Sequence, residues 1–151
     1  MSAHRLRVQR KPFDTLTAAE NAGWARLLRE SANSRWAFLS PTYAEAATLA
    51  LGPVDVLLFW QSDELVGVMP LQRASGWLGR MGMREPVGRH MTDYFGLLAR
   101  PGLQLDWRSL LLKAGVPCLY FTHLDESQSA HGLKGDSRKS GLRTCIHPAG
   151  G

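Results

Sequence analysis

Two apolar runs separated by a four-residue polar break constrain the fold of this chain more than any other feature. Residues 54–60 are almost all apolar, residues 61–64 contain no apolar side chain, and residues 65–71 are apolar again. Such runs are typical of strands covered on both faces, and the break is typical of a turn. The pattern predicts a buried β-hairpin at the centre of a mixed sheet. In its second strand, alternation places Val66 with Val68 on one face and Leu65, Met69 and Leu71 on the other.

Two helices with clear end signals precede the hairpin. Thr17 followed by Glu20 is a capping-box pattern and predicts the start of the first helix. Ser40 before Pro41 predicts the start of the second helix, because proline at the first helical position loses no hydrogen bond. Gly52 predicts its end.

The second half of the chain carries shorter and more interrupted elements. We expect an edge strand at 4–10, a short strand or bulged segment at 77–83, strands at 94–99 and 118–124, and a third helix capped by Asp106. The glycines at 76, 79 and 82 do not have dinucleotide-fingerprint spacing and are interpreted as turns and bulges. The predicted fold class is therefore a single α/β (α+β) domain with a mixed, mostly antiparallel sheet flanked by helices. Residues 1–124 form this domain, and residues 125–151 form a polar linker with room for one short strand at 141–147.

Composition limits the function classes. The chain has 151 residues and a formal net charge of +5, but its basic residues are scattered and no nucleic-acid motif is present. No apolar stretch is long enough to cross a membrane, and the basic N-terminus is not followed by the apolar segment of a secretory signal. The two cysteines form no disulfide framework, and the histidines have no metal-ligand spacing. We expect a cytoplasmic protein with no nucleic-acid partner, no membrane partner and no metal.

Three segments in this order carry a family resemblance: residues 24–47 with an aromatic residue before the Ser-Pro helix start, residues 55–73, and residues 92–102 with the sequence TDYFGLLARPG. Together they resemble the GNAT superfamily of acyl-CoA-dependent N-acyltransferases. The detail is similar to the CelD-type (cellulose-biosynthesis-associated) acetyltransferases, which are related to the Fem-type peptidyl transferases.

The resemblance implies a function for a larger assembly. CelD-type members consist of two GNAT-like halves in tandem, and the second half carries the transfer site; this chain resembles the first half. It implies acetyl-CoA or another acyl-CoA as the cofactor of the complete enzyme, or no cofactor in this chain, and a second GNAT-like half or a homo-oligomer as partner. We expect no catalysis by this chain alone. A non-catalytic interaction module and a truncated remnant remain alternative interpretations.

The resemblance also implies site residues. The phosphate-binding turn of the superfamily corresponds here to residues 100–106, which places Arg100 and Gly102 near a cofactor. Pro101 lacks an N–H donor and Asp106 adds a negative charge, so a plain turn into a capped helix is the alternative. A carboxylate beside a phenol, Asp93 and Tyr94, can supply a general base and a proton donor; a turn cap and a packed strand start explain the same pair.

Overall fold

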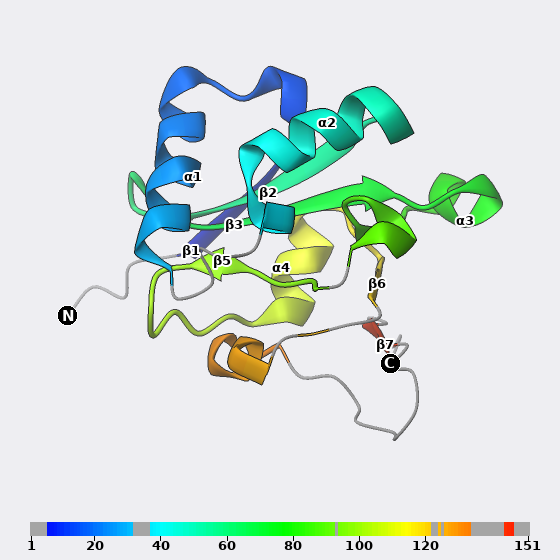
Figure 1. The fold of residues 1–151 in the computed structure, drawn as a ribbon. Coiled ribbons are helices and arrows are strands. Elements are labelled where there is room, and N and C mark those ends of the chain that lie inside the picture. Colours follow the sequence, from blue (N-terminus) through cyan, green and yellow to red (C-terminus); the bar gives the residue numbers. More distant parts are fainter. Residues whose placement is uncertain are drawn as a thin grey trace.

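The computed structural model describes residues 6–31, 37–92, 94–121, 124, 126–133 and 144–146. Seven strands in this part of the chain form one mixed sheet in the order β1-β2-β3-β4-β6-β7, and β5 pairs with β3 (Figure 1). The strands are β1 (Leu6–Pro12), β2 (Val54–Gln61), β3 (Glu64–Arg73), β4 (Met83–Pro86), β5 (Leu98–Ala99), β6 (Cys118–Phe121) and β7 (Thr144–Ile146). The α-helices are α1 (Ala18–Glu30), α2 (Pro41–Leu51), α3 (Gly76–Arg80) and α4 (Trp107–Lys113). Short 3-10 helices are η1 (Phe13–Thr15), η2 (Ala37–Leu39), η3 (Arg89–Met91) and η4 (Glu126–His131). The predicted fold class is confirmed: this is a single α/β domain with a mostly antiparallel sheet.

The predicted central hairpin is present as β2 and β3. The two strands pair antiparallel from Val54↔Gln72 to Gln61↔Glu64, with a register shift between Phe59 and Trp60. At this shift, β3 contributes one extra residue, so side-chain alternation reverses locally. The predicted assignments of Val66 and Leu65 were therefore wrong. Val66 packs with Met69 and Leu71 on one face, whereas Leu65 packs with Val68 on the other.

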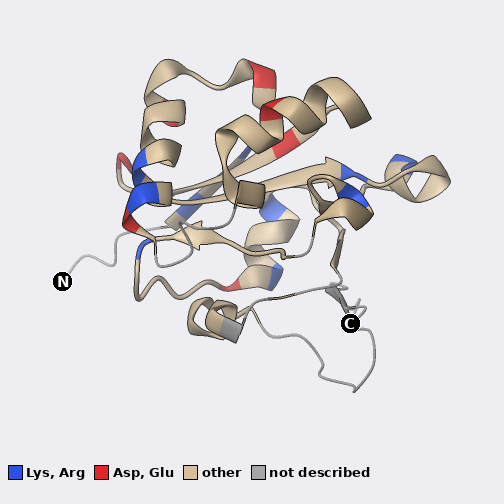
Figure 2. Ribbon diagram, viewed as in Figure 1, with Lys and Arg blue, Asp and Glu red and all other residues tan. Residues whose placement is uncertain are grey.

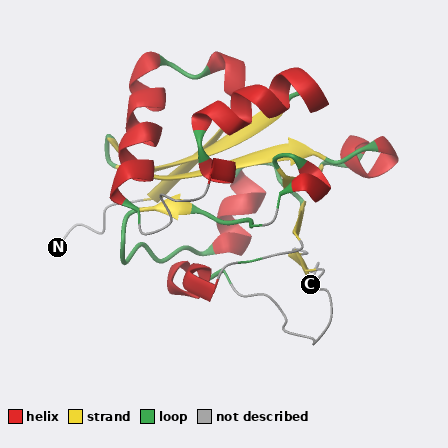
Figure 3. Cartoon of the chain, viewed as in Figure 1, coloured by secondary structure: helices red, strands yellow, loops and turns green. Residues whose placement is uncertain are grey.

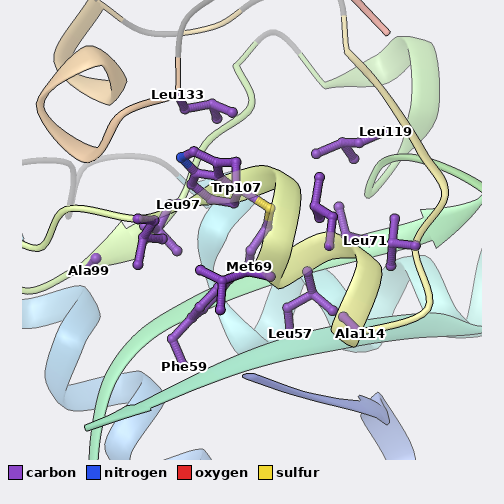
Figure 4. Close-up of a cluster of buried hydrophobic side chains, with 14 of the residues drawn as sticks. Leu57, Phe59, Met69, Leu71, Leu97, Ala99, Trp107, Ala114, Leu119 and Leu133 are labelled. Atoms are coloured by element: carbon purple, nitrogen blue, oxygen red, sulfur yellow. The ribbon is translucent and has the colours of Figure 1, made fainter. Parts of the chain in front are cut away.

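Helices cover both faces of the sheet (Figure 3). On one face, α1 and α2 bury a core that includes Trp24, Ala47 and Leu58. The N-terminus of α1 has the predicted capping box of Thr17 and Glu20, and α2 begins at Pro41 after Ser40, as predicted. On the other face, α4 lies over a second core (Figure 4).

The fourth position of the sheet is shared by two short strands. β4 pairs with one end of β3 and β5 pairs with the other end, and the described residues between them, 87–92 and 94–97, belong to neither strand. The prediction of a strand at 77–83 was wrong: residues 76–80 form α3 and β4 begins at Met83. Gly76 and Gly82 have positive φ angles of 65° and 95°, which turn the chain before and after this helix. In Figure 1, α3 lies beyond the end of the sheet.

After α4, β6 returns parallel to β4, and β7 pairs antiparallel with β6. One predicted strand is shorter than expected: the segment 94–99 is a strand only at Leu98–Ala99 among its described residues. Of the predicted strand 118–124, the structure describes Cys118–Phe121 as β6, and residues 122 and 123 lie outside the described residues. Residues 126–131, within the segment predicted as a linker, form η4, and β7 lies within the segment 141–147. None of the helices in the described ranges is long and apolar enough to span a bilayer.

Candidate functional site

The sheet opens beside the segment Phe95–Ala99. β5 pairs with β3 on one side, and β6 pairs with β4 only at Met83 and Arg84. Between the segment that precedes β5 and the segment that follows β6, the described residues form one isolated parallel bridge, Phe95 with Leu124. No described strand pairs with Leu97 on the side away from β3.

The side chain of Gln128 in η4 occupies the opening. Its Oε1 accepts a hydrogen bond from Leu97 N–H at 2.7 Å, and its Nε2 donates to the Leu97 carbonyl at 3.2 Å. Gln128 is fully buried, with 0% exposure. A carboxamide has the same donor and acceptor as a peptide unit, so Gln128 replaces a neighbouring strand at this one residue. Gly96 is required here, because a Cβ would lie 2.7 Å from the Gln128 carboxamide carbon.

The rest of η4 covers the turn that leads into α4. Trp107 Nε1 donates to the His131 carbonyl at 2.9 Å, and the Gln104 side chain donates to the Ala130 carbonyl. His131 Nδ1 lies 2.8 Å from the Leu103 carbonyl oxygen. Leu133 is buried beside Trp107 in the core shown in Figure 4. The chain therefore fills, with its own residues, the surface that flanks the predicted phosphate turn.

The structure places Arg100, one of the two predicted cofactor residues, at the tip of the central hairpin. Arg100 N–H continues the β5 ladder by donating to the Val66 carbonyl at 2.9 Å. The Arg100 guanidinium donates to Gln61 Oε1 and lies 3.5 Å from Glu64 Oε2. Arg100 and residues 61–64 line an open groove of about 650 Å³. The carboxylates of Asp63 and Glu64 in this groove disfavour a phosphate there by like-charge repulsion.

Neither Gly102 nor Tyr94 is among the described residues that line this groove. Gly102 has a φ of 77°, and a Cβ on it would meet nothing within 4 Å, so it serves as an open turn residue. Tyr94 is 47% exposed. Asp93 lies outside the described residues, so its pairing with Tyr94 stays a prediction.

Glu85 on β4 is a candidate acid–base residue that the sequence analysis missed. Its carboxylate is 15% exposed and lies 3.1 Å from Arg89 Nε. Burial raises the pKa of Glu85 above its usual value of 4.5, and the charges of Arg89 and His90 offset only part of this effect. A carboxyl with a raised pKa is suited to accept a proton from an amine or hydroxyl group. One sequence signal could have identified it: Glu85 is the only acidic residue between positions 65 and 92.

The loop after Glu85 is fixed to the α2 face of the sheet. Gln72 is 1% exposed; it accepts a hydrogen bond from Gly88 N–H at 3.1 Å and donates to the Gly52 carbonyl at 3.1 Å. The Thr92 hydroxyl donates to the Val87 carbonyl and lies 3.2 Å from the Tyr43 hydroxyl. Gly88 has a φ of 85° and leaves room for the Tyr43 hydroxyl. Any residue with a Cβ at position 88 would bring that Cβ within 2.0 Å of this hydroxyl. Glu85 is thus held on a firmly anchored segment.

Metal chemistry has no candidate site in the described ranges, because no three His, Cys, Asp or Glu side chains there could hold an ion together. Comparison with protein-family models, with curated proteins and with solved structures found no match to this chain.

Proposed function

We propose that this chain is the first GNAT-like lobe of a CelD-type, acyl-CoA-dependent N-acyltransferase and does not catalyse transfer by itself. The observation that carries the proposal is the interrupted fourth strand. An otherwise antiparallel sheet is followed by a crossover helix, α4, and a parallel strand, β6, and it leaves the backbone of Leu97 without a strand partner among the described residues. The family resemblance implies a mixed sheet that opens beside its central strands, and this arrangement supports the proposal.

Two features support the view that this lobe alone does not hold the cofactor. Gln128 already satisfies both backbone groups of Leu97, so an amide-containing ligand would have to displace it. Arg100 is held by Gln61 and Glu64 at the hairpin tip. In the complete enzyme, the second lobe would supply the acyl-CoA site, and the acyl group of acetyl-CoA or another acyl-CoA would pass to an amine or sugar acceptor. We place this enzyme in the cytoplasm, with no nucleic-acid or membrane partner, on the basis of the scattered charge and the cysteine content.

The direct test is calorimetric titration of the chain with acetyl-CoA. We expect no saturable heat up to about 1 mM ligand, a concentration that detects affinities weaker than those of most enzyme substrates. The chain is then mixed with the second half of a CelD-type enzyme, and acyl transfer is followed as release of the CoA thiol. Transfer only in the mixture supports the proposal. Micromolar binding by this chain alone, or no association with the second half, contradicts it.

A second candidate function is a non-catalytic interaction module. It is favoured by the exposed apolar side chains on and beside α3: Trp77 is 67% exposed and Met81 is 69% exposed. Side chains of this size are rarely left together in solvent without a binding role. Under this alternative, the chain associates with a partner but releases no CoA thiol in any mixture.

A further inference from the structure

The segment from Gly76 to Gly82, here termed the α3 tip, presents three apolar side chains to solvent. Trp77 is 67% exposed, Leu78 is 38% exposed and Met81 is 69% exposed. The tip lies beyond the end of the sheet, away from both cores (Figure 1). Folding of this chain therefore gains little from burying these side chains, although burial of an indole and a thioether is favourable.

Glycines make the α3 tip compact. A Cβ on Gly79 would lie 1.8 Å from the Ala74 carbonyl oxygen, and a Cβ on Gly82 would lie 2.8 Å from the Pro117 ring. These close approaches hold the short helix against the end of the sheet, with Trp77 and Met81 facing outward. The tip is thus a fixed projection and not a loose loop.

One arginine lies on the α3 tip and a second lies just before it, at the end of β3. Arg73 and Arg80 are exposed, and neither guanidinium has a hydrogen bond or ion pair within the described part of the chain. Figure 2 shows basic residues on α3 and at the adjacent end of β3. A surface that combines apolar side chains with unpaired cations is complementary to an apolar groove with carboxylates at its rim.

This chain contains such a groove between η1, α1 and α2. It has a volume of about 490 Å³, and its apolar lining includes Phe13, Leu16, Ala25 and Pro41. Asp14 and Glu45 line it as well, both are exposed, and neither carboxylate has a partner within the described ranges. We call it the acidic groove. Its volume lies within the range of pockets that accept bulky apolar groups. Figure 2 shows acidic residues on η1 and α2, away from the α3 tip.

We propose that the α3 tip of one copy binds in the acidic groove of a second copy. Trp77 and Met81 contact Phe13, Leu16 and Pro41, while Arg80 faces Asp14 and Glu45. Because the tip and the groove are different surfaces of the chain, the contact is head-to-tail and produces a ring or an open chain of copies. One tip buries less surface than a stable dimer requires, so we expect dissociation constants of about 10 to 100 µM. This inference does not depend on the acyltransferase assignment.

Sedimentation velocity of the full chain tests the proposal, from about 5 µM to about 500 µM, a range that brackets the expected dissociation constant. We expect the sedimentation coefficient to rise with concentration and to fall again in about 0.5 M salt, which screens the charge pairs. Trp77→Glu (tip) and Glu45→Lys (groove) should each weaken association at least tenfold. Leu112→Glu on α4, where Leu112 is 53% exposed, is the matched control and should associate as the unaltered chain does.

Mixing the two variants gives the sharpest outcome. The intact tip of Glu45→Lys fits the intact groove of Trp77→Glu, so the mixture should form a one-to-one dimer and nothing larger. Far-UV circular dichroism of each variant establishes that it is folded. A chain that stays monomeric at all concentrations overturns the proposal. Loss of association in Trp77→Glu but not in Glu45→Lys also overturns it, and so does Trp77-dependent sedimentation with vesicles containing phosphatidylserine in place of self-association.

Discussion

Glu20 combines a capping role with a cross-element ion pair. Its Oε2 accepts a hydrogen bond from Thr17 N–H at 2.7 Å, and its carboxylate lies 2.8 Å from Lys11 Nζ on β1. Burial alone would raise the pKa of Glu20, but the hydrogen bonds from Lys11 and Thr17 outweigh this effect and leave its pKa below the usual 4.5. One carboxylate therefore fixes the start of α1 and attaches it to the edge strand of the sheet.

We expect Glu20→Gln to lower the free energy of unfolding by about 1 kcal/mol at pH 7, as a lost cap and a partly buried pair together suggest. A carboxyl whose pKa is lower in the folded state than in the unfolded state stabilises the folded protein at pH values above its unfolded-state pKa. This contribution disappears as pH falls through the folded-state pKa. The difference between the two proteins should thus vanish in acid, as measured by urea unfolding from pH 7 down to pH 3.

Glu85 should show the opposite pH dependence. Burial raises the pKa of Glu85, so the folded state favours the protonated carboxyl. The free energy of unfolding therefore falls as pH rises through the folded-state pKa of this group. We expect Glu85→Gln to match the unaltered chain below about pH 4 and to become the more stable protein as pH rises toward 7, by about 1 kcal/mol or less. Thermal unfolding at a series of pH values measures this difference. A less stable Glu85→Gln at pH 7 would mean that the pair with Arg89 outweighs burial.

At the scale of elements, the Gln128 side chain joins η4 to the backbone of Leu97. Gln128→Ala leaves the N–H and carbonyl of Leu97 buried without partners, and each such group costs about 1 to 3 kcal/mol. We expect a loss of about 2 to 4 kcal/mol in the free energy of unfolding. Faster hydrogen exchange at the Leu97 amide should accompany it. Gln104→Ala, which removes one exposed hydrogen bond to the same helix, should cost less than about 1 kcal/mol. Equal losses in the two variants would contradict the role of Gln128.

The same element marks the limit of what the sequence can predict. The start of α1 at Thr17 and the start of α2 at Ser40-Pro41 depend on residues within a few positions, so local patterns located them. The segment around Leu97 has the composition of a strand, but its polar partner, Gln128, lies 31 positions away. Nothing in a polar, serine-rich segment indicates that one glutamine will be fully buried. The expectation for Arg100 came from the family resemblance, and local sequence could not indicate its hydrogen bond to Gln61, which lies 39 positions away.

At the scale of the whole molecule, the two cores share one hairpin. The central strands β2 and β3 contribute alternate side chains to both, so α1 and α2 on one face depend on the same backbone as α4 on the other. The composition of residues 54–71 identified these strands as buried on both faces, and this part of the candidate fold was predicted in full apart from the bulge at Val66. A domain built in this way should unfold as one cooperative unit, because neither layer of helices has a sheet of its own.

Adjacent residues on β2 allow a matched test of this cooperativity. Leu57 and Leu58 are both 0% exposed, but Leu57 packs in the core under α4 and Leu58 in the core under α1 and α2. We expect Leu57→Ala and Leu58→Ala each to cost about 2 to 5 kcal/mol, the range for a leucine truncated in a packed core. Each variant should show a single transition, with near-UV and far-UV circular dichroism melting together, since damage to either face weakens the shared hairpin. If Leu58→Ala instead releases α1 and α2 at a lower temperature than the rest, the two layers are separate folding units, and the chain does not behave as one lobe.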